Sequence, residues 1–117
     1  MRVKAYLIIL ALLLAPAFSE EQNISVTDED GRNVIVPASP KSIVCLSPGA
    51  AEAIYSLGRS DLIVAITDDC DMPPALLKKE RIGKSSRNAD LERIIELNPD
   101  LVIAKTGGLF PEDDEQR

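Results

Sequence analysis

The stretch that decides the fold is Ser42–Ile66, SIVCLSPGAAEAIYSLGRSDLIVAI. Each end of it is a short apolar run, which is typical of strands covered on both faces in a parallel sheet. Between the runs, Ser47 suits a helix N-cap, Pro48 suits the first helical position and Gly58 suits a left-handed stop. The stretch therefore predicts strand, helix and strand, which together make one right-handed βαβ unit.

Further elements are expected on the C-terminal side of this unit. Arg81–Gly83 is a candidate third, minimal strand, and Leu101–Ala104 is a clear buried strand. Between them, Asp90 is placed to cap a helix over Leu91–Leu97, which Asn98-Pro99 would stop. Helical spacing predicts that both helices bury one face. The residues expected on those faces are Ala50, Ala53, Ile54 and Leu57 in the first helix, and Leu91, Ile94 and Ile95 in the second.

On the N-terminal side, Ile24–Val36 is typical of a β-hairpin. Asp30-Gly31 is the residue pair favoured in a two-residue turn. Such a turn pairs the residues on either side of it one by one. The expected pairs are Glu29 with Arg32, Thr27 with Val34, and Val26 with Ile35. The predicted fold class is thus α/β: a short parallel sheet with flanking helices, a Rossmann-like lobe, preceded by a β-hairpin.

The first nineteen residues are expected to be a secretory signal peptide. Two basic residues precede an apolar run that is too short to span a bilayer, and small residues occupy the positions before a cut after Ser19. The protein would then be exported and extracytoplasmic, or membrane-anchored if the signal is retained. Residues 20–117 would form the folded part, with 11 basic against 19 acidic residues and a net charge of −8. A chain this acidic is an unsuitable partner for nucleic acid.

The composition also limits the chemistry. The chain of 117 residues has no His, so it cannot supply the base of a Ser-His-Asp or Cys-His site, or a His-ligated metal centre. An enzymatic alternative would make Cys70 a nucleophile beside Asp69 or Asp71, but no base is evident. We therefore expect no catalytic residues, no resident metal and no cofactor. Export would also permit Cys45 and Cys70 to pair, and their spacing leaves open whether they do.

Four loops follow the predicted strands at their carboxyl ends, where ligands bind in open α/β sheets. They are Ser47–Gly49, Asp68–Asp71, Lys84–Ala89 and Lys105–Gly108. The first three also have purely structural explanations. The first suits a helix cap, the second a solvated acidic turn and the third a solvated loop, while the acidic turn lacks the spacing of an EF-hand calcium site.

The order of the motifs is more specific than any one of them. The motifs are KSIVCLSPGAAE at 41–52, Leu57-Gly58, TDDCDMPP at 67–74, RIG at 81–83 and DLERIIELNPDLVIA at 90–104. In this order, over residues 24–108, the chain resembles the amino-terminal lobe of the periplasmic binding proteins that feed ABC importers of iron-siderophores, haem and cobalamin. Such proteins hold their ligand between two α/β lobes joined by a long helix.

The resemblance implies a binding role and a set of residues for it. The cleft-facing residues would be Ser47, Pro48, Asp69, Cys70, Asp71, Lys84, Ser85, Ser86 and Arg87. Glu92 would match the glutamate that docks onto arginines of the membrane permease. Cobalamin binders of this family usually carry aromatic rings in the second and third cleft loops, and this chain has none there. An iron chelate whose negative charge meets Lys84 or Arg87 is therefore favoured over cobalamin.

Length leaves an alternative open. About 98 residues remain after the expected signal, whereas a cleft needs two lobes, about twice this mass or more. The chain would then be a truncated or split-gene lobe that acts only as an interaction module, without binding ligand by itself. A second lobe supplied by another chain is a further partner that this alternative allows.

Overall fold

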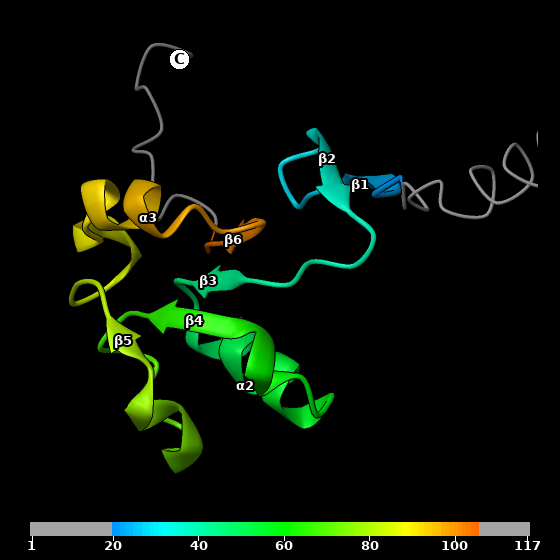
Figure 1. Cartoon of the computed structure of the whole chain (residues 1–117). Coiled ribbons are helices and arrows are strands. Elements are labelled where there is room, and N and C mark those ends of the chain that lie inside the picture. The colour runs from blue at the N-terminus through cyan, green and yellow to red at the C-terminus, as the bar shows by residue number, and fades with distance from the viewer. Residues whose placement is uncertain (1–19, 106–117) are drawn as a thin grey trace, which may run out of the picture.

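The computed structural model describes residues 20–105, which form an antiparallel hairpin and a parallel sheet flanked by helices (Figure 1). The expected signal peptide lies outside these residues. The strands are β1 Asn23–Thr27, β2 Asn33–Pro37, β3 Ile43–Cys45, β4 Ile63–Ile66, β5 Glu80–Arg81 and β6 Leu101–Ile103. The α-helices are α2 Pro48–Ser56 and α3 Leu91–Leu97, and short 3-10 helices cover Ser60–Leu62, Pro74–Lys78 and Ser86–Asn88. Within 20–105, no helix combines the length and apolarity that crossing a membrane requires.

The four-stranded sheet has the order β5-β4-β3-β6, and every neighbouring pair is parallel. The predicted strand-helix-strand unit is confirmed as β3, α2 and β4. The minimal third strand begins one residue earlier than expected, at Glu80, and its ladder ends at Arg81. The Ile82 amide still donates to the Ile66 carbonyl at 3.0 Å, and Gly83 turns away to bridge with Ala89.

The predicted helix ends are confirmed. The Ser47 hydroxyl accepts from the Ala50 amide at 3.5 Å, Pro48 begins α2, and Gly58 has a φ of 73° just past its end. In α3, the Asp90 carboxylate accepts from the Arg93 amide at 3.0 Å, and Asn98 ends the helix with a φ of 44°. Local capping chemistry therefore determines where both helices start and stop.

The predicted buried faces of the helices are partly wrong. In α2, Ala51 is buried and Ala50 and Ile54 pack beside it, whereas Ala53 and Leu57 are exposed. Leu57 lies past the last helical turn, so it does not continue the stripe. In α3, which is only two turns long, Ile94 is buried with Leu97 beside it. The other two predicted members of that face, Leu91 and Ile95, are exposed because so short a helix touches the sheet along a narrow line.

The core has two layers, one on each face of the sheet. Cys45, Ala51, Ile63, Ile66, Cys70 and Leu76 form the layer under α2. Val44, Leu46, Ala65, Ile82 and Ile94 form the layer under α3. In β3, Val44 and Cys45 contribute to opposite layers, as the two-residue period of a strand requires. In β4, Ile63 and Ile66 join the layer under α2 and Ala65 joins the layer under α3, and the pairing of β3 with β4 is irregular between Ile43 and Val44. Both helices are needed to cover the sheet.

The hairpin forms where predicted, but its register is shifted by one residue. Thr27 faces Asn33 and Val26 faces Val34, in place of the expected Val34 and Ile35. The reason is Asp28, whose carboxylate accepts from the amides of Asp30 and Arg32 at 3.0 and 2.8 Å. With Gly31 at a φ of 77°, these bonds make a three-residue loop with a bulge, rather than a two-residue turn.

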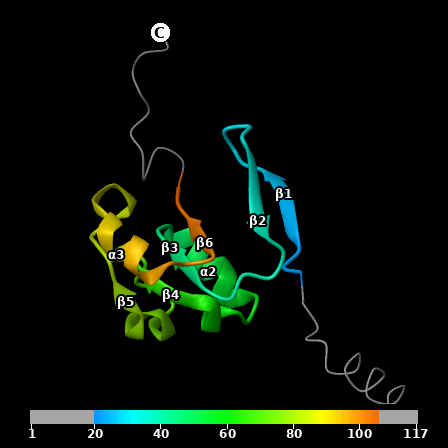
Figure 2. The same cartoon turned by 45° about the horizontal axis from the view of Figure 1, so that its top comes forward.

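The shift in register also changes the ion pairs of the hairpin. Arg32 donates to Asp28 at 2.7 Å and to Asp30 at 2.9 Å, rather than standing opposite Glu29. The hairpin stands beside the sheet, and its turn lies at the same end of the molecule as the tip of β6 (Figure 2).

Candidate ligand-binding edge of the sheet

The carboxyl ends of the four strands meet at one edge, because all four run parallel. Ser47-Pro48 follows β3, Asp68–Asp71 follows β4 and Lys84–Arg87 follows β5. The strand order places the acidic loop between the other two. The structure thus brings three of the four sequence-predicted loops together at one edge, where their role in binding stays a prediction. The fourth predicted loop, Lys105–Gly108, lies outside the described residues from position 106 onward.

The first loop is fully explained by the start of α2. The Ser47 hydroxyl caps the helix, and the Ser47 carbonyl accepts from the Ala51 amide at 3.0 Å and from the Cys45 thiol at 3.4 Å. Ser47 and Pro48 are both half-buried. A ligand at this edge would meet the positive end of a nine-residue helix.

The acidic loop is held from within and from its neighbour. The Thr67 hydroxyl, which is buried, donates to the Asp69 carboxylate, and the Asp68 amide donates to the Gly83 carbonyl at 2.8 Å. Asp68, Asp69 and Asp71 are exposed, whereas Cys70 is completely buried. The carboxylates therefore face solvent at this edge, and the Cys70 thiol faces the core instead.

The basic loop folds back on itself tightly. Gly83 has a φ of 135°, and a Cβ atom there would lie 2.1 Å from the Asn88 carbonyl oxygen. The Asp90 amide closes the loop by donating to the Ile82 carbonyl at 2.7 Å, and Ser85 donates to the Asn88 side chain at 3.3 Å. Ser85 and Ser86 are half-buried, while Lys84 and Arg87 are exposed. The compact backbone therefore leaves the two cationic side chains outermost.

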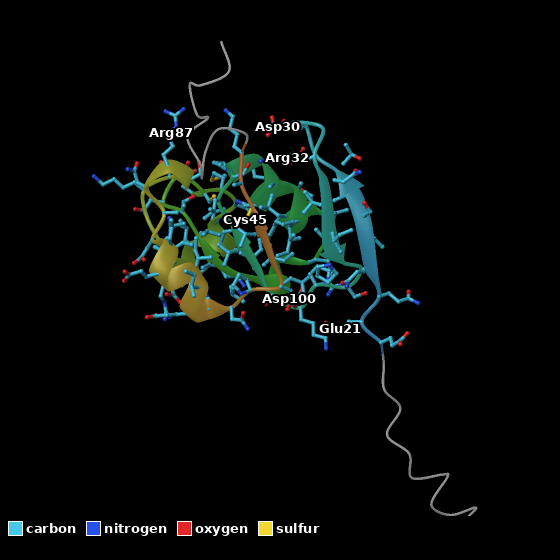
Figure 3. The ribbon with its side chains drawn as sticks, turned by 90° about the horizontal axis from the view of Figure 1, so that it is seen from above. Glu21, Asp30, Arg32, Cys45, Arg87 and Asp100 are labelled. Carbon is cyan, nitrogen blue, oxygen red and sulfur yellow. The ribbon has the colours of Figure 1, made fainter. Side chains whose placement is uncertain are left out.

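Figure 3 shows where this edge lies in the molecule. Arg87 points outward at the end that also carries the hairpin residues Asp30 and Arg32, and Asp100 lies at the opposite end. A hollow of 340 Å³ is lined by Glu20, Glu21, Gln22, Pro37, Ala38, Ser39 and Lys41. Glu21 also lies at the end opposite Arg87, so that hollow is separate from the candidate site.

Arg81 is a residue of this edge that sequence reasoning missed. Its guanidinium Nη1 lies 3.3 Å from the Asp68 carbonyl, 3.5 Å from the Thr67 carbonyl and 3.6 Å from the Asp68 carboxylate. It fixes the backbone of the acidic loop to β5. The pairing of β5 with β4 puts Arg81 beside Ile66. Only that pairing, which spans fifteen residues of sequence, reveals the role.

Glu92 is exposed in the first turn of α3, behind the Asp90 cap. The next residue, Arg93, joins Glu80 and Glu96 in an ion-pair network, with 2.8 Å between Arg93 Nη1 and a Glu96 oxygen. Hydrogen bonds from Arg93 hold the pKa of Glu80 below its usual value, and the bonds to Glu80 and Glu96 raise the pKa of Arg93. At the start of α3 itself, the carboxylates are those of the Asp90 cap and of Glu92, which a helix N-terminus favours.

The two thiols are unsuited to nucleophilic chemistry. Burial raises the pKa of Cys45 to about 11 and also raises the pKa of Cys70, so both are protonated near neutral pH. Across residues 20–105, the acids and cysteines form no group of three that could hold a metal ion. Asp68 and Asp69 are instead engaged by Arg81 and Thr67. The arrangement suits non-covalent recognition at an edge with both signs of charge.

Similarity to known proteins agrees with this arrangement. The family profile described as periplasmic binding protein matches residues 43–117. This chain belongs to the periplasmic binding protein family. It is 35% identical over 81 residues to an uncharacterised ABC transporter substrate-binding lipoprotein of Bacillus subtilis, covering 69% of this chain and 25% of that protein. It is also 35% identical over 77 residues to a vitamin B12-binding protein of Vibrio cholerae, covering 66% of this chain and 28% of that protein.

The fold is similar to a solved member of the family as well. The crystal structure of the heme-binding protein HmuT aligns with a TM-score of 0.60 and 32% identity, covering 71% of this chain and 27% of that one. The chain thus spans about a quarter of the length of the relatives that it matches. These relatives are named as binding proteins, not as enzymes.

Proposed function

We propose that this chain is the ligand-contacting amino-terminal lobe of the substrate-binding component of an ABC importer. It would capture an iron chelate or cobalamin outside the cytoplasm and deliver it to a membrane permease, without covalent chemistry. The observation that carries the proposal is the meeting of three polar loops at the carboxyl edge of one sheet, in a family whose matched members are named for binding vitamin B12 and heme.

The loop chemistry favours an iron chelate as the ligand. Lys84 and Arg87 are exposed at the edge, where they can pair with carboxylate or other anionic groups of a chelate. The loops Asp69–Met72 and Lys84–Arg87 contain no aromatic ring on which a corrin could stack. Cobalamin is therefore the second choice.

Delivery would use Glu92 as one of the docking points on the permease. Its exposure at the start of α3 leaves its carboxylate accessible to an arginine of a partner. The role requires export, for which residues 1–19 would be the signal, cleaved or retained as an anchor. Nothing in the similarities supports a second lobe supplied by a separate chain.

Titration of the purified chain with hemin, a ferric hydroxamate and cobalamin, followed by calorimetry, tests the binding proposal. We expect saturable binding of an anionic iron chelate, weakened roughly tenfold when Lys84 and Arg87 are both replaced by Ala. Lys78→Ala is the matched control, because Lys78 is exposed and lies before the amino end of β5. Absence of saturable binding to every probe would leave only the interaction-module alternative.

Docking is tested with the importer's permease in detergent or nanodiscs. Glu92→Ala should weaken association by up to roughly tenfold and leave ligand affinity unchanged, because the residue lies on the helix surface and not in a loop of the edge. Glu52→Ala, an exposed acid on α2, is the control. Equal association of the two variants and the parent chain would contradict the docking role.

A further inference from the structure

Two buried cysteines lie under the candidate edge, and the binding proposal uses neither thiol. Cys45 is the last residue of β3, and Cys70 belongs to the acidic loop after β4. Both are free thiols, fully buried, and members of the same core layer under α2. Figure 3 shows Cys45 in the interior of the molecule.

The distances bring the two residues into each other's immediate surroundings. The Cys70 sulfur lies 3.9 Å from the Cys45 carbonyl oxygen and 3.6 Å from the Thr67 hydroxyl. The Cys45 sulfur donates to the Ser47 carbonyl at 3.4 Å, toward the start of α2. The two thiols also interact electrostatically. Burial is the main cause that raises the pKa of Cys45, and the charge interaction with Cys70 raises it further.

We propose that Cys45 and Cys70 form a disulfide that ties the acidic loop to the end of β3. The Cys45 side chain must turn away from the Ser47 carbonyl toward Cys70, which breaks one weak thiol hydrogen bond. The bridge would tie the loop that carries Asp69 and Asp71 to the end of β3, two residues before Ser47. It goes beyond the proposed function, since it needs no ligand.

The chemistry is thiol–disulfide exchange with a small disulfide such as oxidised glutathione. One cysteine thiolate attacks the small disulfide and forms a mixed disulfide, releasing one thiol. The second cysteine thiolate then attacks the protein sulfur of that mixed disulfide and releases a second thiol. Two protein thiols are thus oxidised and one small disulfide is reduced to two small thiols, which take up the two protons that the protein thiols lose.

The timing follows from burial. Both thiols are shielded from solvent and held protonated in the folded state, so exchange there is slow. Exchange during folding, while the loop is still open, is therefore the expected route. An oxidising extracytoplasmic compartment supplies the conditions.

The test folds the full chain with oxidised glutathione, then unfolds it in the presence of a maleimide and measures its intact mass. We expect no maleimide adduct and a mass about 2 Da below that of the dithiol chain. A chain folded with reductant should carry two adducts, and Cys45→Ser or Cys70→Ser should carry one adduct or one bound glutathione. Two adducts on the oxidised parent chain, or a disulfide that links two chains on a non-reducing gel, would overturn the proposal.

A second measurement reports on the loop itself. Hydrogen exchange at the Asp68 and Cys70 amides, which donate to the Gly83 and Thr67 carbonyls, should be slower in the oxidised chain than in the reduced one. The Arg32 amide in the hairpin is the internal reference and should exchange equally in both. Equal protection of the loop amides in an oxidised chain of the lower mass would overturn the tie between β3 and the acidic loop.

Discussion

The hairpin and the parallel sheet differ in how much of their side-chain surface is buried. Every residue of β1 is exposed, and Ile35 of β2 keeps 67% of its surface in contact with solvent. Every residue of β3 is buried, and Ile66 of β4 has no exposed surface. A two-stranded ribbon with little buried area is marginal in water, whereas a sheet covered on both faces gains from the hydrophobic effect. The two parts therefore depend on different interactions.

The hairpin depends on contacts that are close in sequence. The single carboxylate of Asp28 accepts hydrogen bonds from the Asp30 amide and from both the backbone and the side chain of Arg32. The sheet depends on contacts between residues far apart in sequence. For example, the Asp100 carboxylate accepts from the Lys41 and Ser42 amides at 2.6 and 3.2 Å, and these bonds join the start of β6 to the start of β3. Local chemistry shapes the first part, and long-range burial stabilises the second.

The largest expected effect contrasts two isoleucines. Ile66→Ala should lower the free energy of unfolding by about 2–5 kcal/mol, because it leaves a cavity in a filled core layer. Ile35→Ala, its exposed counterpart, should cost less than about 1 kcal/mol. Urea denaturation followed by circular dichroism measures both. If Ile66→Ala does not fold, Ile66→Val should still cost about 0.5–1.5 kcal/mol. If Ile66→Ala and Ile35→Ala lower the free energy of unfolding equally, burial does not distinguish the sheet from the hairpin.

A smaller effect is expected from a glycine at the edge. Gly83→Ala should cost about 1–3 kcal/mol, since the new Cβ meets the Asn88 carbonyl and the φ is unfavourable for alanine. Gly49→Ala is the control, because no atom lies within 4 Å of a Cβ built there. Thermal melts and the exchange of the Asp90 amide report the effect. If Gly83→Ala lowers the stability no more than Gly49→Ala does, the basic loop is not packed as tightly around Gly83 as the structure shows.

The smallest effect is a local pH dependence in the hairpin. The Arg32 backbone amide, together with the Arg32 side chain, holds the pKa of Asp28 below its ordinary value. A lowered folded-state pKa stabilises the turn above the unfolded pKa of about 3.9, and this stabilisation is lost as the pH falls through the folded value. NMR shifts of the Arg32 amide should therefore be constant near neutral pH and change in acid.

Asp28→Asn isolates the contribution of this carboxylate. It should shift the Arg32 amide signal at neutral pH, and lowering the pH should change that signal less than in the parent chain. Asp61→Asn is the control, because Asp61 pairs with Arg59 outside the hairpin at 3.4 Å. An acid transition of the same size in Asp28→Asn and in the parent chain would show that another group controls the turn.

Much of the fold is predictable from sequence because it rests on local chemistry. Ser47, Gly58, Asp90 and Asn98 mark the ends of both helices, and each does so through bonds or backbone angles within a few residues. The apolar runs of β3, β4 and β6 also identify the strands, although β6, which covers Leu101–Ile103 at the end of the sheet, is half-buried and not buried as expected. The candidate edge was also predictable in outline, since parallel strands place their following loops together.

The hairpin register marks the limit of such reasoning. Asp30-Gly31 indicates a turn but not its length. The Asp28 carboxylate accepts from the amides of Asp30 and Arg32 and so stabilises the longer loop. The same limit applies to the helix faces, where Leu57 and Ile95 follow the apolar spacing and are nevertheless exposed. Spacing predicts which face of a helix is apolar. How much of that face is buried depends on the length of the helix and on its position against the sheet.

By itself, the sequence determined the order of strands and helices, their caps and the kinship with periplasmic binding proteins, since these depend on residue types at short spacing. Tertiary structure alone decided the role of Arg81, the closeness of Cys45 to Cys70 and the burial of the Cys70 thiol. The physical reason is that each of these depends on which strands lie side by side. In the order β5-β4-β3-β6, residues from 13 to 59 positions apart become neighbours.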